Sequence, residues 1–392
     1  MTSQTTASYR YAIPGLQTKQ SPGLADVTVC IPTFNRARHL KYLLDWFVQQ
    51  GEQLGGARIL VSDNQSTDET RSTVESFKSS LPGLEYRLNA GKPTAERNII
   101  NSYHAVATEY CVYCADDDFL DLANLKLIVS QMRANANLGA VFTPHCYFDA
   151  IRKQITGQFY NVPGEVRLER GNFAALANLI LDFRIFPEIG VFRAKAARTL
   201  IHSNHFGYFA FVDAARLLLG FDILFQSNRS HYLWTTEHPV REPRMNAGTT
   251  EAMEHWDRHR AGLEYVISLA NSHQNLHADH RRIMEAKIES FVSGRLSVAI
   301  RMHLGAGNFM NALMIARRLH ARAMLPDSEL EFFRLAAAAE YIGREGGGKY
   351  RLDSRFPAKV HELFTKSDLV DPGNPALAEI SLHSAQELAK SF

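Results

Sequence analysis

The sequence predicts an α/β protein: a mostly parallel sheet flanked by helices, followed by an α-helical C-terminal region. From about residue 25 to residue 150, short apolar runs alternate with longer segments whose apolar residues recur at helical spacing. Alternation of this kind implies β-α-β units with parallel strands. Beyond residue 249 the short apolar runs disappear and only the helical spacing remains.

The first strand–helix pair lies between residues 26 and 50. Asp26–Ile31 reads DVTVCI, a β-branched run closed by Pro32, and predicts a buried strand. Arg38–Gln50 follows, with Leu40 and Leu44 among the apolar residues at helical spacing, and predicts a helix.

Two further units repeat the pattern. Ala57–Val61 predicts the second strand, and a helix starting at Thr67 or Asp68 places Val74 and Phe77 on its inner face. The third strand and helix are expected at 84–88 and 94–106. Asn98 is interpreted as a residue on the surface of that third helix.

The last units of the predicted sheet lie between residues 110 and 148. Strands are expected at 110–115 and 139–148, with a helix at 123–132 between them. Cys111 and Cys114 fall in the first of these strands, where residues three apart face opposite sides. We therefore expect buried thiols there and neither a shared metal nor a disulfide.

Composition sets the limits of the functional prediction. At 392 residues and 45% hydrophobic, the chain is long enough for more than one domain with a sizeable core. A net charge of +2 does not indicate a nucleic-acid partner, and no apolar run is long enough to cross a membrane. The polar residues 1–24 are interpreted as a disordered leader and not as a signal peptide. Reduced cysteines fit a cytoplasmic protein, with peripheral membrane association left open.

Polar segments follow the first four predicted strands and should converge on one rim of the sheet. They read IPTFNR at 31–36, SDNQSTD at 62–68, NAGK at 89–92 and ADDD at 115–118. Three adjacent carboxylates repel one another unless a divalent cation lies among them, and Mg²⁺ and Mn²⁺ prefer oxygen ligands. Alternation along the strand places Asp116 and Asp118 on one side. The alternative is a polar turn that caps the next helix, with Asp121 as a further cap.

These motifs, in this order, resemble those of the family 2 glycosyltransferases, which have the GT-A fold. The resemblance covers about residues 26–230. It implies a GT-A domain at 25–248, with a donor half at 25–150 and an acceptor half at 151–248, and a helical domain at 249–392.

The resemblance also implies a role for individual residues. Asp118, with Asp116, would bind Mn²⁺ or Mg²⁺; Asp116 would also face the ribose, and Asp117 the sugar. A histidine beyond the core, His238, is a candidate to complete the metal site. The residues implied in nucleotide and diphosphate binding are Pro32, Thr33, Asn35, Arg36, Asp63, Asn64, Lys92, Arg97, Asp116, Asp117, Arg241 and Arg244.

An inverting transferase needs a general base that takes the proton of the acceptor hydroxyl. In the segment GYFAFVDAARLLLG the resemblance implies Asp213 as this base, at the start of a helix, although Val212 stands where the family often has an acid. The alternative for Asp213 is charge–dipole stabilisation of that helix. The segment 184–193 is expected to be a connecting loop, whose Glu188 contacts acceptor hydroxyls or serves the fold.

The C-terminal third predicts an antiparallel helical bundle. Apolar residues recur at helical spacing within 288–300, 309–319 and 330–335. This bundle is a candidate for homo-oligomerisation, for docking a partner, or for peripheral membrane contact.

Together these observations predict a metal-dependent, inverting glycosyltransferase. The donor would be a nucleoside diphosphate sugar, with UDP the favoured nucleotide, and the acceptor a glycan, a lipid-linked glycan or another hydroxyl compound. The alternative is a non-catalytic sugar-nucleotide or glycan-binding protein that acts through its helical region. A sugar-phosphate nucleotidyltransferase would need a glycine-rich phosphate loop near its N-terminus, which this sequence lacks.

Overall fold

The computed structural model describes most of the chain. The described residues are 23–91, 93–202, 206–227, 229–241, 256–305 and 308–321, together with 330 and 333. The predictions for residues 1–22, for Lys92, for Arg244 and for most of the helical segment 330–335 lie outside the described residues.

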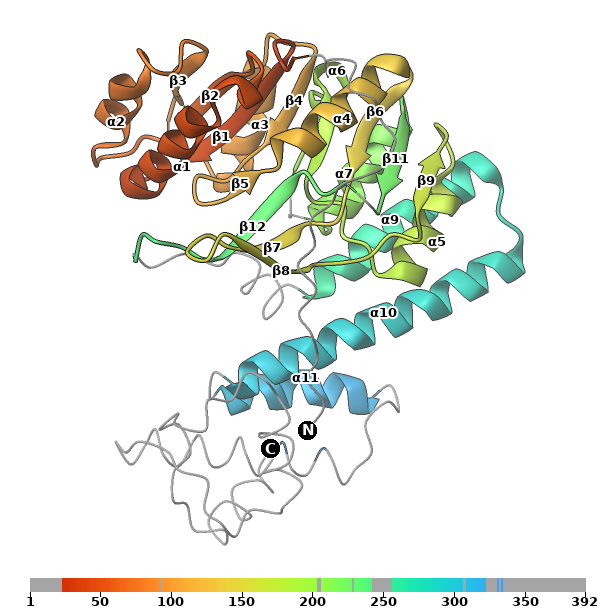
Figure 1. Ribbon diagram of the computed structural model, residues 1–392. Helices are drawn as coiled ribbons and strands as arrows, with labels where there is room; N and C mark the ends of the chain where they lie inside the picture. The colour runs from red at the N-terminus through yellow and green to blue at the C-terminus, as the bar shows by residue number, and fades with distance from the viewer. Residues whose placement is uncertain are drawn as a thin grey trace, which may run out of the picture.

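A large mixed sheet forms the centre of the molecule (Figure 1). Its order is β3-β2-β1-β4-β10-β6-β11-β9, and four of its seven strand pairings are parallel. The strands are β1 (Val27–Thr33), β2 (Arg58–Asp63), β3 (Leu84–Leu88), β4 (Tyr110–Tyr113), β6 (Leu138–Phe142), β9 (Glu165–Leu168), β10 (Gly190–Arg193) and β11 (Asp222–Gln226). The predicted α/β class is confirmed.

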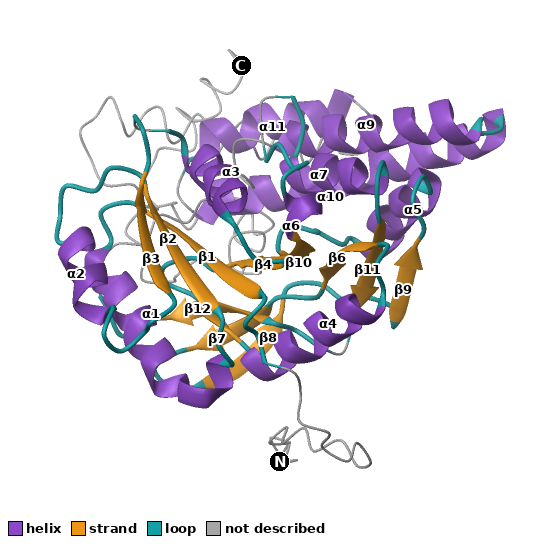
Figure 2. Cartoon of the chain, turned by 90° about the horizontal axis from the view of Figure 1, so that it is seen from above, coloured by secondary structure: helices purple, strands orange, loops and turns teal. Residues whose placement is uncertain are grey.

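Helices cover both faces of this sheet (Figure 2). One face carries α1 (Ala37–Gln50), α2 (Thr70–Phe77) and α4 (Leu122–Ala134), and a short 3-10 helix, η1 (Gly51–Leu54), follows α1. The other face carries α3 (Ala95–Ala105), α5 (Phe173–Phe183), α6 (Ala194–Ala197) and α7 (Phe209–Leu218).

The alternation of side chains along the strands divides the core in two. Cys111 belongs to the core under α3 and α7, whereas Cys114 belongs to the core under α1 and α4. Both thiols are free and buried, as their spacing predicted.

A smaller sheet packs beside the rim of the large one. Its order is β5-β12-β7-β8, with β5 (Phe119–Leu120), β7 (Cys146–Asp149), β8 (Gln154–Gln158) and β12 (Tyr232–Glu237). The prediction of one strand at 139–148 was wrong, because β6 and β7 belong to different sheets. Pro144 lies between them and has no N–H to offer a strand ladder, so the chain leaves one sheet there and enters the other.

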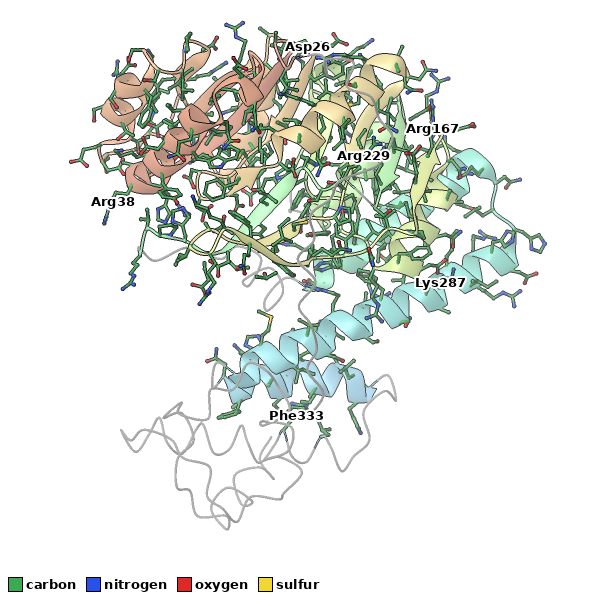
Figure 3. All side chains as sticks on the ribbon, viewed as in Figure 1. Asp26, Arg38, Arg167, Arg229, Lys287 and Phe333 are labelled. Carbon is green, nitrogen blue, oxygen red and sulfur yellow. The ribbon has the colours of Figure 1, made fainter. Side chains whose placement is uncertain are left out.

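The described part of the C-terminal region is helical, as predicted, with α9 (Trp256–Gln274), α10 (Ala278–Gly305) and α11 (Phe309–Ala321). Helix α9 packs on α5 and α7, and α10 runs alongside α9, α5 and α11. Lys287 of α10, labelled in Figure 3, lies 2.7 Å from the Asp182 carboxylate and 3.2 Å from Oδ1 of Asn178, both on α5. None of the described helices combines the length and the apolar character needed to cross a bilayer.

Candidate active site

The ends of β1, β2 and β3 are tied together by a buried amide. Asn98 of α3 accepts hydrogen bonds from Ser62 Oγ and Asn89 Nδ2, each at 2.7 Å, and donates to the Ser62 carbonyl at 3.0 Å. Asn98 is 3% exposed, so its interpretation as a surface residue was wrong. The amide satisfies polar groups that the strand ends would otherwise bury unpaired.

Two residues predicted to bind the nucleotide of the donor shape the first loops of the rim. Asn35 adopts a φ of 52°, and its Oδ1 accepts a 2.7 Å hydrogen bond from the Thr67 amide. Asp63 accepts from the Ser66 amide at 2.9 Å, the Ser66 hydroxyl at 2.6 Å and the Tyr86 hydroxyl at 2.6 Å. The loops after β1 and β2 are therefore locked to each other through short polar side chains.

The acidic triplet lies beside these loops, at the end of β4. Thr33 donates to Asp116 at 2.7 Å, and Arg36 bridges the triplet, 3.2 Å from Asp116 and 2.6 Å from Asp117. Burial raises the pKa of Asp116 to about 7, against the opposing effect of Arg36. The triplet is thus a nearly buried concentration of negative charge that one arginine offsets only in part.

Asp118 has a different set of contacts. Its carboxylate accepts a 2.6 Å hydrogen bond from the Tyr232 hydroxyl and a 2.8 Å bond from the Thr235 amide, both on β12. No strand was predicted for this segment. The run Tyr232–Glu237 is rich in aromatic and β-branched residues, which is the signal that would have predicted the strand.

The triplet suits a divalent cation in its chemistry. Three carboxylates and one guanidinium leave a formal charge of −2, and the side-chain atoms available to ligate a cation are carboxylate oxygens. Among the residues that the structure describes, however, no three His, Cys, Asp or Glu side chains are grouped so that they could hold a metal ion by themselves. The remaining ligands of a cation would then come from the substrate, as is usual for Mg²⁺ beside phosphates.

The other residues predicted to bind the donor differ in their surroundings. His238 is buried among rings, with centroids 4.9 Å from His39, 5.1 Å from Tyr42 and 6.4 Å from Phe119. Pro32 is part of β1, and Asn64 donates to the Pro93 carbonyl at 2.7 Å. Arg97, in the first turn of α3, and Arg241, after β12, are exposed.

Asp213 does not start its helix, contrary to the expectation. Helix α7 begins at Phe209, so Asp213 is its fifth residue. Its Oδ1 accepts from the Ile201 amide at 3.0 Å and its Oδ2 from the His202 amide at 3.0 Å, while His202 Nδ1 lies 3.5 Å away. The apolar residues from Phe209 to Val212 belong to the first turn of the helix, so the helix starts four residues before the expected position at Asp213.

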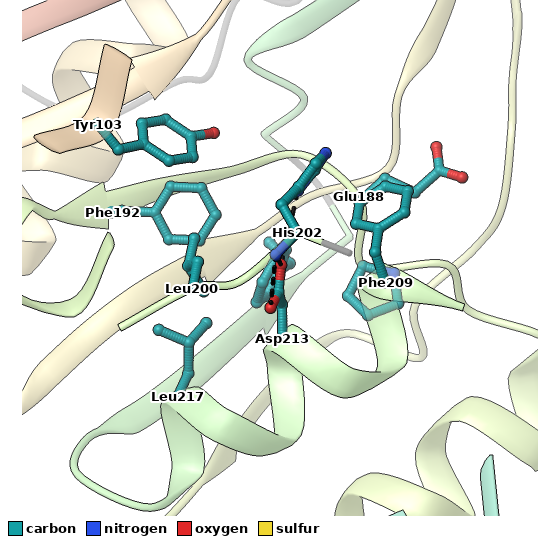
Figure 4. Close-up of a pocket in the computed structure, with 10 residues that line it drawn as sticks. Tyr103, Glu188, Phe192, Leu200, His202, Phe209, Asp213 and Leu217 are labelled. Carbon is teal, nitrogen blue, oxygen red and sulfur yellow. Dashed lines mark hydrogen bonds and ion pairs between the residues drawn. The ribbon is translucent and has the colours of Figure 1, made fainter. Parts of the chain in front are cut away.

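A small pocket adjoins Asp213 on the α7 side of the sheet (Figure 4). Polar residues of its lining are Glu188, His202 and Asp213, and apolar ones include Phe192 and Phe209. Its volume of about 10 Å³ is the space of a single water molecule.

Comparisons with known proteins find similarity to glycosyltransferases. The family model described as glycosyl transferase family 2 matches residues 28–197. An abequosyltransferase of Salmonella typhimurium is 27% identical over 113 residues, 29% of this chain and 34% of that protein. A GalNAc(5)-diNAcBac-PP-undecaprenol beta-1,3-glucosyltransferase of Campylobacter jejuni is 29% identical over 119 residues, 30% of this chain and 37% of that protein.

The chain thus spans little more than a third of the length of these two relatives. Among solved structures, S. aureus TarS 1-349 in complex with UDP-GlcNAc has a TM-score of 0.49 and 14% identity, covering 83% of this chain and 93% of that one. The matched segment contains β1 to α6 and all four polar segments of the rim. Residues 28–197 of this chain therefore match the glycosyl transferase family 2 model, and they lie within the α/β fold described above.

Proposed function

We propose that the protein is a metal-dependent, inverting glycosyltransferase. It moves a sugar from a nucleoside diphosphate donor, with UDP the favoured nucleotide, to an acceptor hydroxyl. The observation that carries the proposal is the linked set of Thr33, Arg36 and the acidic triplet at the strand ends of a family 2 domain. The names of the matched relatives, two of which are sugar transferases, support the reaction class.

The proposed reaction makes specific demands on this rim. Departure of a nucleoside diphosphate develops negative charge at its β-phosphate, which needs cations placed nearby in advance. A divalent cation held by Asp116 and Asp118 would supply such positive charge as a Lewis acid. The loops locked by Asn35 and Asp63 would fix the position of the nucleoside.

Calorimetry with nucleoside diphosphates tests the donor site. We expect one of UDP, GDP, CDP and dTDP to bind in a Mn²⁺-dependent way. Asp118→Asn should weaken that binding by roughly 10-fold or more, since it removes charge from the triplet. The matched control is Asp222→Asn, because Asp222 lies at the start of β11, pairs with Arg167 at 2.6 Å and is not part of the rim.

The outcomes separate the candidate functions. Failure of all four nucleotides to bind, with and without Mn²⁺, would contradict a sugar-nucleotide site. Metal-dependent binding without hydrolysis of any nucleotide sugar, and without transfer to any acceptor, would favour the non-catalytic binding protein.

A further inference from the structure

The pairing of β10 with β4 brings one glutamate to the rim. The two strands are antiparallel, with Val191 opposite Val112 and Arg193 opposite Tyr110. Because antiparallel strands advance in opposite directions, the start of β10 lies beside the end of β4. Glu188 lies two residues before β10 and Ala115 two residues after β4, so both leave the pairing at the end where the acidic triplet follows.

The start of α7 holds the same glutamate. Tyr208, the N-cap residue of α7, donates its hydroxyl proton to Oε1 of Glu188. Tyr208 is 3% exposed, whereas Glu188 is half-buried. A buried phenol thus orients a carboxylate that solvent still reaches.

Asp213 differs from Glu188 in its surroundings. Asp213 is 6% exposed, and its oxygens face the backbone amides of Ile201 and His202. Figure 4 shows the Glu188 carboxylate directed away from Asp213. The contacts of Asp213 fix the segment before α7, which makes it a positioning residue for that end of the pocket.

We infer that Glu188 is the general base toward the acceptor, an inference that rests on the proposed function. Glu188 takes the proton of the acceptor hydroxyl as the oxygen forms its bond to the anomeric carbon of the donor sugar. The bond from that carbon to the β-phosphate oxygen breaks, and its electron pair leaves with the nucleoside diphosphate. Tyr208 orients the carboxylate, and the transferred proton ends on Glu188.

Glu188→Gln tests this role, because the amide keeps the size and still accepts from Tyr208 but does not take up a proton. We expect nucleoside diphosphate binding within about 2-fold of wild type, and release of diphosphate from the nucleotide sugars, with water as acceptor, slowed about 10²- to 10⁴-fold. The matched control is Glu109→Gln. Glu109 pairs with Arg193 at the opposite end of the same two strands, so this variant should turn over like wild type.

Azide separates a base from a structural residue. Azide is an anionic nucleophile that needs no proton removal, so it should restore diphosphate release and form a glycosyl azide in Glu188→Gln. Wild-type turnover in Glu188→Gln, or failure of azide to restore it, would overturn the inference. If wild type itself neither binds nor cleaves any of the nucleotide sugars, the proposed function fails, and the assignment of Glu188 with it.

Discussion

At the scale of single residues, two buried histidines couple the protein's stability to pH. His145 and His231 are each at most 1% exposed and lie beside Tyr232, the residue that holds Asp118. Burial lowers the pKa of His145 to about 4 and that of His231 to about 3. Nε2 of each finds no hydrogen-bond partner among the described residues, so a proton added there would be buried without compensation.

The sign of the pH dependence follows from these depressed pKa values. The unfolded histidines bind protons near pH 6.5, while the folded ones stay neutral to about pH 4 and pH 3. The histidines' contribution to the free energy of unfolding is therefore complete above pH 6.5. It falls as the pH drops toward 4, by up to about 1.4 kcal/mol per pH unit for each histidine.

Urea unfolding at a series of pH values measures this slope. We expect His145→Phe, which keeps an aromatic ring beside Phe159 and Tyr160, to remove about half of the pH dependence that the two histidines give to the free energy of unfolding. An unchanged slope between pH 4 and 6.5 would show that His145 is protonated in the folded state.

At the scale of elements, the caps of helices link local sequence to the rim. Asp121 is the N-cap of α4, and its Oδ1 accepts from the Asn124 amide at 2.9 Å. Asp121→Ala should lower the free energy of unfolding by about 1 kcal/mol, and Asp121→Asn by much less, because asparagine caps a helix as well as aspartate does. Chemical denaturation compares the two variants. An equal loss in both would mean that the charge of Asp121, and not its cap, stabilises the helix.

The sequence predicted those helices and strands that depend on the pattern of neighbouring residues. The alternation from Val27 to Ala134 depends on runs of neighbouring residues, and Asp121 was identified as a cap candidate from its position alone. The division between β6 and β7 and the central position of β10 depend on pairings with distant segments. The contacts of Asp118 with Tyr232 and of Glu188 with Tyr208 likewise join residues far apart in sequence, so spacing did not reveal them.

At the scale of the whole molecule, the C-terminal helices share a core with the sheet. The apolar cluster under α7 continues through α9 into α10 and α11. Within it, the ring of Phe291 on α10 lies 5.7 Å from that of Phe186 and 5.9 Å from that of Phe211, centroid to centroid. Phe186 is two residues before Glu188, so the same core supports the proposed acceptor side of the site.

This shared core predicts that the α/β part and helices α9 and α10 unfold together. Phe291→Ala removes a ring that is 4% exposed and should cost about 3–5 kcal/mol. In a Trp256→Phe background the remaining tryptophans, Trp46 of α1 and Trp234 of β12, report the α/β part. Urea unfolding should then give the same lowered midpoint by circular dichroism, which reports the helices, and by tryptophan fluorescence. The matched control is Ile283→Ala on α10, where a 53% exposed side chain should change the free energy by less than about 0.5 kcal/mol. Loss of helical signal at a lower urea concentration than the fluorescence change would instead indicate an independent helical domain, whose packing contributes little to the α/β part.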